Sequence, residues 1–240
     1  MKRLLVTLLI LSLLGCNNQS KPSSLPGSDG TVHSVGAMRN VMWNGALGPV
    51  LSLDTLIPRE GLYGLGPESY LRGELLIVDG QTYVSRVVSD STMQVSKTSE
   101  VSAPFFVYGR VMKWKASHLS NEVHNLKALE AYLDAETQAL KRPFVFMLKG
   151  TLSQGTIHIQ NLPMGTKVSS PQEAHQGQVN YELEDASVTL VGFFSKAHQG
   201  VFTHHDSYMH VHLLSEDETQ MGHLDAAQWE GGMKLYLPEE

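Results

Sequence analysis

The segment MHVHLL contains two histidines, His210 and His212, at a spacing that could bind one metal ion. Side chains alternate between the faces of a β-strand, so both imidazoles would project from one face, about 7 Å apart at Cα. A polar stretch over residues 215–220 suits a turn, and Gly222-His223 would then begin a strand returning beside the first. His223 would complete three nitrogen ligands with one coordination position open, as in catalytic zinc sites. We therefore expect zinc or another divalent metal as cofactor.

The elements that must position these residues read as mostly strands. Two apolar runs flank Asp79-Gly80, which predicts a hairpin because both central residues of a type I′ turn need positive φ. Apolar residues at helical spacing predict one helix over residues 121–141, capped by Ser120 or Asn121 and stopped by Pro143. Further strand-like runs cover residues 144–148, 156–160, 179–184, 188–194 and 208–213. The predicted fold class is α+β, with two packed, mostly antiparallel or mixed β-sheet halves and one prominent helix.

The amino terminus is typical of a targeting segment rather than of part of the folded domain. Met1-Lys2-Arg3 precedes an apolar run over residues 4–14, which suits a signal peptide. The run ends in LLGC, which resembles the lipobox of bacterial lipoproteins, so Cys16 is the expected lipidation site, although an ordinary secretory signal is the alternative. We predict a signal peptide over 1–15, a lipid-anchored linker over 16–31 and one domain over 32–240, with possible halves 32–142 and 143–240. The protein would be exported and anchored to the bacterial cell envelope, and Asn17 favours the outer membrane.

Composition and the lack of other motifs exclude several classes. The formal net charge of −6 argues against a general nucleic-acid binder, which needs Lys and Arg to displace counterions. The sequence has no Walker A loop, no Gly-x-Gly-x-x-Gly before a helix, no Cys-x-x-Cys and no Gly-x-Ser-x-Gly. We expect a small-molecule substrate and contact with a membrane through the lipid anchor only, and a homodimer is compatible with the sequence. His198, His204 and His205 form a secondary cluster, and the remaining histidines, His175 among them, read as surface residues.

The histidine pattern resembles the α-acetolactate decarboxylase family, which carries His-x-His, a polar turn and then Gly-His. The resemblance continues in Gly64-Leu65-Gly66 followed by Gly73-Glu74, and in Val191-Gly192-Phe193. It implies that family's fold and the decarboxylation of α-acetolactate, a 2-hydroxy-3-keto acid, to acetoin. It also implies that Glu74 is an active-site glutamate.

The implied chemistry assigns roles to two further residues. A divalent metal could chelate the substrate's hydroxyl and carbonyl oxygens and act as a Lewis acid while carbon dioxide leaves. The resulting enediolate needs a positioned acid, and Glu74 could relay that proton or stabilise the substrate. The family arginine that holds the substrate carboxylate falls on His158, which could meet a carboxylate when protonated but lacks the guanidinium fork.

Departures from the family pattern keep two alternatives open. Arg72 stands where the family has aspartate, and the family tail returns a glutamate to the metal, whereas this sequence ends at Glu239-Glu240. One alternative is another three-histidine metalloenzyme, such as a hydrolase or a cupin-type oxygenase, in which Glu216 follows His212; metal identity would discriminate it. The other is a non-catalytic metal- or ligand-binding lipoprotein on the same scaffold, which would bind metal without turnover.

Overall fold

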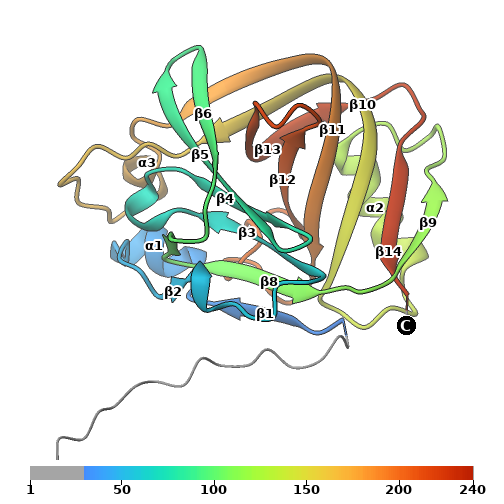
Figure 1. Ribbon diagram of the computed structural model, residues 1–240, viewed down its shortest axis with the longest axis horizontal. Helices are drawn as coiled ribbons and strands as arrows, with labels where there is room; N and C mark the ends of the chain where they lie inside the picture. The colour runs from blue at the N-terminus through green and yellow to red at the C-terminus, as the bar shows by residue number, and fades with distance from the viewer. Residues whose placement is uncertain (1–29, 240) are drawn as a thin grey trace, which may run out of the picture.

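The computed structural model describes residues 30–239, so the predicted signal peptide and Cys16 lie outside the described residues. Two six-stranded sheets and a two-stranded sheet, β2 (Leu51–Ser52) with β7 (Ser102–Ala103), make up the strands (Figure 1). The first six-stranded sheet has the order β1-β8-β3-β4-β5-β6, and all its pairings are antiparallel. Its strands are β1 (Val32–Val35), β3 (Leu62–Pro67), β4 (Glu74–Val78), β5 (Gln81–Ser89), β6 (Thr92–Lys97) and β8 (Phe106–Arg110).

The second sheet has the order β11-β12-β13-β10-β14-β9, and β10 also pairs with β11. The pairings of β10, β11, β12 and β13 therefore form a closed ring. Its strands are β9 (Trp114–His118), β10 (Phe144–Ile159), β11 (Val179–Phe194), β12 (Met209–Ser215), β13 (Met221–Gln228) and β14 (Lys234–Pro238). The chain passes from the first sheet to the second between β8 and β9, ahead of the possible division at residue 142.

The two sheets pack face to face, as the α+β prediction required. Alternate residues of β10 separate into two environments: Val145 and Met147 face the first sheet, whereas Phe144 and Phe146 pack on the opposite side. The inter-sheet core joins side chains from both sheets, among them Tyr63, Leu65, Leu76, Tyr83, Val107, Val145, Met147, Val191, Phe193, Leu214 and Met221. At one edge, Tyr83 donates a hydrogen bond of 2.7 Å to Glu218 in the β12–β13 turn, which ties the sheets together.

The hairpin predicted around Asp79-Gly80 is confirmed. β4 and β5 pair directly across these two residues, which have φ of 46° and 83°. This tight turn fixes the register of β4, and Glu74 lies at the first position of that strand.

The predicted helix exists but is shorter than residues 121–141. α2 (Leu126–Glu136) is capped by the Asn125 side chain, which accepts a hydrogen bond from the Ala128 N–H, so neither Ser120 nor Asn121 is the cap. The chain before Asn125 pairs instead with the end of β13 and the residue after it, where the Trp229 N–H donates to the His124 carbonyl. The helix also ends at its C-cap, Thr137, so Pro143 is not the residue that stops it.

Two strands are longer than the sequence predicts. The runs at 144–148 and 156–160 belong to the one strand β10, which ends at Ile159, and those at 179–184 and 188–194 are parts of β11. The residues between the runs, Gly150 and Gly155 of β10 among them, do not interrupt either strand because the two strands pair along nearly their whole lengths.

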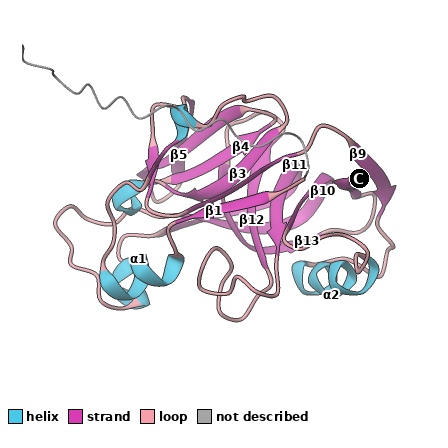
Figure 2. Ribbon diagram, turned by 90° about the horizontal axis from the view of Figure 1, so that it is seen from below, coloured by secondary structure: helices cyan, strands magenta, loops and turns pink. Residues whose placement is uncertain are grey.

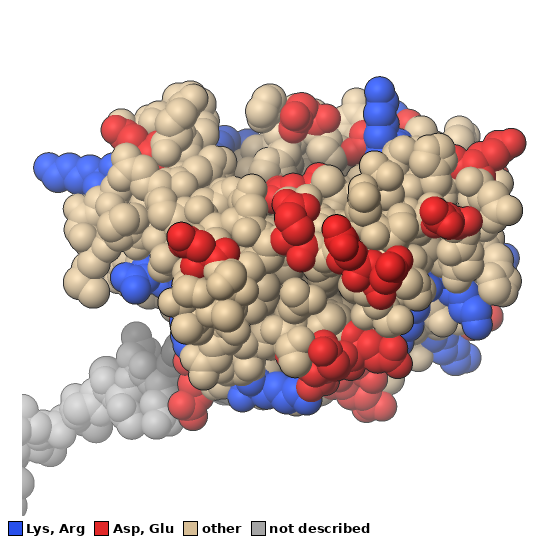
Figure 3. Space-filling model, turned by 90° about the horizontal axis from the view of Figure 1, so that it is seen from above, with Lys and Arg blue, Asp and Glu red and all other residues tan. Residues whose placement is uncertain are grey.

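The short helices lie away from α2. α1 (Met38–Asn44) and α2 are at opposite ends of the molecule (Figure 2), and α3 (Pro171–Ala174) contacts α1. The turns η1 (Leu53–Thr55) and η2 (Ser69–Leu71) complete the helical elements among residues 30–239. None of these helices has the length and apolar character needed to cross a membrane. Acidic side chains gather across the face shown in Figure 3, in keeping with the net charge of −6.

Candidate metal centre

The three histidines predicted as metal ligands come together between the two sheets. His210 and His212 alternate along β12 with Met209, Val211 and Leu213, which face the other side, so both imidazoles point toward the first sheet. His223 lies on β13 directly opposite His212 in the antiparallel register. One ring nitrogen from each histidine lies within 4.8 Å of the others, and the Nε2 atoms of His210 and His212 are 3.2 Å apart.

Burial keeps these three imidazoles uncharged. Their exposed fractions are 3%, 0% and 7% for His210, His212 and His223. Loss of hydration lowers the pKa of His212 to about 3 and places the pKa values of the other two well below the ordinary histidine range, with neighbouring histidines adding to the effect. Neutral imidazole is the form that binds a metal ion.

The orientation of His210 is fixed from outside the cluster. Its Nδ1 donates a hydrogen bond of 2.6 Å to the Phe202 carbonyl, so the Nε2 lone pair faces the other histidines. Such a bond on the second ring nitrogen is typical of metal-ligating histidines. Three converging imidazole nitrogens fit zinc and other divalent transition metals. The residues present therefore fit the expected metal.

Glu74 reaches the same site from the first sheet. Its side chain is buried, its Oε1 accepts a hydrogen bond of 3.3 Å from the Gln160 N–H, and its Oε2 is 3.7 Å from His212 Nε2. Burial raises the pKa of Glu74 to about 7, against the opposing effect of His158. This carboxyl can hold a proton near neutral pH.

His158 also lines the site. It lies on β10 opposite His223, and the two ring centroids are 4.6 Å apart. Its Nδ1 is 2.8 Å and 2.9 Å from the two carboxylate oxygens of Asp225, and its Nε2 is 3.3 Å from Gln160 Nε2. His158, His223 and Asp225 form a second group that could hold a cation, but it shares His223 and so belongs to the same centre.

Sequence reasoning missed Asp225 and Gln160 as members of this centre and offered His204 only as part of a secondary cluster. Asp225 stands two residues after His223 on β13, and that spacing could have placed both on one face. His204 comes from the loop before β12, with its ring centroid 5.0 Å from that of His223, and only the folded loop reveals this. Gln160 directly follows β10 and carried no sequence signal. His175 is exposed, as predicted, but at the rim of the same cavity.

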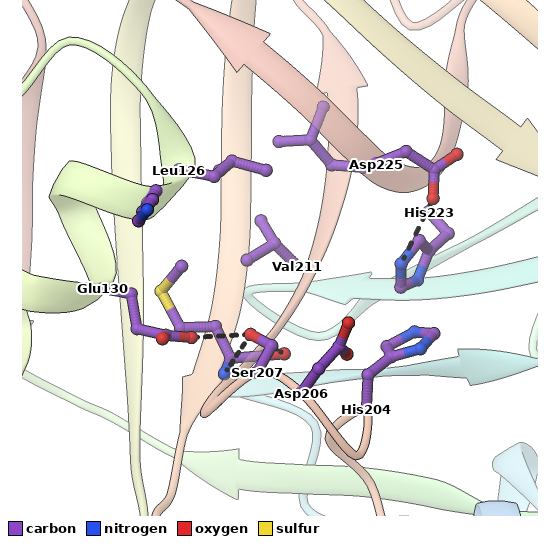
Figure 4. Close-up of a pocket in the computed structure, with 11 residues that line it drawn as sticks. Leu126, Glu130, His204, Asp206, Ser207, Val211, His223 and Asp225 are labelled. Carbon is purple, nitrogen blue, oxygen red and sulfur yellow. Dashed lines mark hydrogen bonds and ion pairs between the residues drawn. The ribbon is translucent and has the colours of Figure 1, made fainter.

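Two hollows meet at the histidines. A cavity of about 30 Å³ is lined by Glu74, His158, Gln160, His210 and His223, together with apolar side chains of α1. A larger pocket of about 470 Å³ opens between α2 and the strands β12 and β13 (Figure 4). His204 and His223 line both hollows, so the larger pocket leads to the metal centre. Glu130 on α2 fixes its wall by accepting hydrogen bonds from Ser207 and the Tyr208 N–H.

The sequence offers three acidic residues as further ligands, and the two that the structure describes lie elsewhere. Glu239 follows β14, and its N–H donates to the Lys113 carbonyl near β9, at the far edge of the second sheet. Glu240 lies outside the described residues. Glu216 is exposed in the β12–β13 turn, where its N–H donates to the Ser187 carbonyl. Neither Glu239 nor Glu216 lines the histidine cavity.

Two packed antiparallel sheets around a buried three-histidine centre define a class of β-rich proteins with a candidate metal site. Within that class, the sequence profile described as alpha-acetolactate decarboxylase matches residues 34–236, and the chain belongs to this family. The resemblance inferred from the histidine pattern is thereby confirmed.

Individual relatives agree with this assignment. The alpha-acetolactate decarboxylase of Streptococcus thermophilus is 24% identical over 183 residues, which cover 75% of this chain and 73% of that protein. That of Methanosarcina mazei is 26% identical over 203 residues, covering 84% of this chain and 66% of that protein. The crystal structure of the Bacillus subtilis strain 168 enzyme superposes with a TM-score of 0.71 at 20% identity, over 87% of this chain and 86% of that one. A Staphylococcus aureus protein of unknown function, similar to the enzyme, gives 0.69 at 15% identity over the same shares. These structures establish the shared fold.

Proposed function

We propose that the protein catalyses the metal-dependent decarboxylation of α-acetolactate to acetoin. The observation that carries the proposal is the convergence of three buried, uncharged histidines with the buried carboxyl of Glu74, in a chain of the α-acetolactate decarboxylase family. A divalent ion such as zinc, held by His210, His212 and His223, would supply Lewis acidity to the substrate oxygens.

Glu74 is proposed as the proton carrier. Breaking the bond between C2 and the carboxylate releases carbon dioxide, and the electron pair moves toward the C3 carbonyl oxygen, which leaves an enediolate. A proton added at C2 then yields acetoin. Glu74 is suited to this step because its carboxyl is buried and its pKa is raised to about 7.

His158 is proposed to contact the substrate carboxylate in place of the family arginine. Asp225 accepts the hydrogen on Nδ1 whether the ring is neutral or protonated. A protonated ring could turn its Nε2–H from Gln160 to a carboxylate entering the cavity, although as a single donor rather than a fork.

The cellular setting is proposed from the sequence alone. The signal-like segment and the lipobox-like LLGC support export and lipid attachment at Cys16, with the outer membrane favoured by Asn17. A linker over residues 16–31 would then tether the domain, which would meet a small-molecule substrate outside the cytoplasm. A homodimer is compatible with this arrangement.

The experiment uses the chain from Asn17 onward, loaded with zinc and given racemic α-acetolactate. Acetoin release is compared among the wild type, His210→Ala and a control, His118→Ala, which removes an exposed histidine of β9. We expect turnover in the wild type and the control and none in His210→Ala. Wild-type protein that holds zinc but releases no acetoin would refute the proposal and favour a non-catalytic metal-binding protein, consistent with histidine at the arginine position.

Glu74→Gln tests the proton carrier separately. The amide keeps the size of the side chain but cannot donate a carboxyl proton, so we expect kcat to fall by roughly 10²- to 10⁴-fold. Zinc content, measured by mass spectrometry on the same preparation, should stay at the wild-type level. Wild-type kcat in the zinc-loaded variant would exclude Glu74 from the proton transfer.

A further inference from the structure

Gln160 is a buried residue of the centre to which the proposed mechanism gives no role. It is 4% exposed and lines the small cavity beside Glu74 and His158. Its carbonyl oxygen, Oε1, is buried and accepts no hydrogen bond from any described residue. A buried acceptor without a donor costs free energy, so such an atom at a binding site points to a donor on the ligand.

The nitrogen end of the Gln160 amide is anchored, which fixes where the oxygen points. Nε2 is 3.3 Å from His158 Nε2 and donates 3.2 Å to Gln178 Oε1. Gln178 Oε1 accepts this bond, since the NH₂ group of Gln178 donates to Asn180 Oδ1. The amide atom facing Gln178 is therefore the NH₂ group, and Oε1 of this cavity-lining residue is left without a donor among the described residues.

The main chain of Gln160 is held as well. Its N–H donates to Glu74 Oε1 across the interface between the sheets. Gln178, the second anchor, is itself fixed through its own amide, which donates 2.9 Å to Asn180. The Gln178 anchor does not depend on His158, so the oxygen stays in place even when His158 turns to a carboxylate.

We propose that Gln160 determines specificity by accepting a hydrogen bond from the C2 hydroxyl of the substrate. This inference rests on the proposed function. An ionised 2-hydroxy-3-keto acid has acceptor oxygens at its carboxylate and keto groups, and its hydroxyl is its single hydrogen-bond donor. An unpartnered acceptor in the site can therefore recognise only that hydroxyl. Gln160 selects 2-hydroxy acids over acids that carry hydrogen at C2.

Binding of two unreactive ligands tests this directly. Isothermal titration of the zinc-loaded chain from Asn17 compares 2-hydroxy-2-methylbutanoate with 2-methylbutanoate, which differ only in the hydroxyl and lack the keto group needed for decarboxylation. The variants are Gln160→Met, which keeps the length but removes the amide oxygen, and Gln154→Met, an exposed control on β10, the strand that Gln160 follows.

We expect the wild type and Gln154→Met to prefer the hydroxy acid, and Gln160→Met to reduce that preference about tenfold, the effect of one hydrogen bond. Affinity for 2-methylbutanoate and zinc content should be unchanged. Gln160→Asn, which withdraws the oxygen by one carbon, should reduce the preference similarly and serves if Gln160→Met does not fold. An equal loss of affinity for both ligands, or no preference in the wild type, would overturn the inference.

Acetoin release on the same preparations separates this inference from the proposed function. A hydroxyl preference that depends on Gln160 in a wild type without turnover would refute decarboxylation yet uphold the contact. Turnover together with a hydroxyl preference that is unchanged in both Gln160 variants would support decarboxylation and refute the contact.

Discussion

Gly192 on β11 should not tolerate even a methyl group. It pairs with Phe146 on one side and with Val211, which stands between His210 and His212, on the other. A Cβ at this position would lie 2.7 Å and 2.8 Å from Cε1 and Cε2 of the Phe146 ring, with Cζ closer still. Phe146 is fully buried in the core that continues to α2, so the ring has no free space into which to move.

The expected cost of Gly192→Ala follows from this overlap. Overpacking a rigid core by one methyl group destabilises by about 1–3 kcal/mol. For a domain of this size each kcal/mol lowers Tm by roughly 2–4 °C, so the variant should melt about 2–12 °C below the wild type. Gly48→Ala is the matched control, because a Cβ there meets no described atom within 4 Å.

Thermal melting followed by circular dichroism measures both variants, and a double-mutant cycle identifies the partner. Phe146→Leu removes the clashing ring atoms, so Gly192→Ala should cost less in that background than in the wild type, with a coupling energy of about 1 kcal/mol or more. A Gly192→Ala protein as stable as Gly48→Ala, or strictly additive effects in the cycle, would refute the packing argument.

Three further predictions concern the link between the two sheets, the cap of α2 and the binding of the metal. Lys97 and Tyr83 hold the pKa of Glu218 below its usual range. Their contribution to folding stability is therefore fully present above about pH 4.3, the ordinary pKa of glutamate, and is lost as the pH falls through the lowered pKa. Glu218→Gln should thus be less stable than the wild type at pH 7, with the difference shrinking in acid melts. Asn125→Ala removes the cap of α2 and should cost about 1 kcal/mol in urea unfolding, whereas an unchanged midpoint would show the cap to be dispensable. Zinc at a hundred times its Kd should stabilise the wild type by about 2.7 kcal/mol, with no shift in Tm for the His210→Ala protein.

The clustering of the three histidines was predictable because their geometry is mostly local. Alternation along one strand places His210 and His212 on one face, and a polar turn followed by Gly-His brings His223 back beside them. The Asp79-Gly80 hairpin was predictable for the same reason, since its turn chemistry lies within two residues.

The rest of the centre depends on contacts between distant segments. Glu74 meets His212 only because the first sheet packs on the second, and sequence resemblance rather than pattern suggested its role. Gln160 and His204 join the site through the end of β10 and the loop before β12, whose paths no local signal specifies. The ends of α2 were misplaced for a similar reason: pairing of His124 with the chain after β13 competes with helix formation.

The proposed function depends above all on a metal ion bound by His210, His212 and His223. X-ray absorption at the zinc edge of the loaded protein measures the ligands themselves, without relying on turnover. We expect one zinc per chain, with three imidazole nitrogens at Zn–N distances of about 2.0–2.1 Å, and the loss of one imidazole ligand in His212→Gln. A shell of oxygen ligands alone, or a spectrum unchanged in His212→Gln, would contradict it.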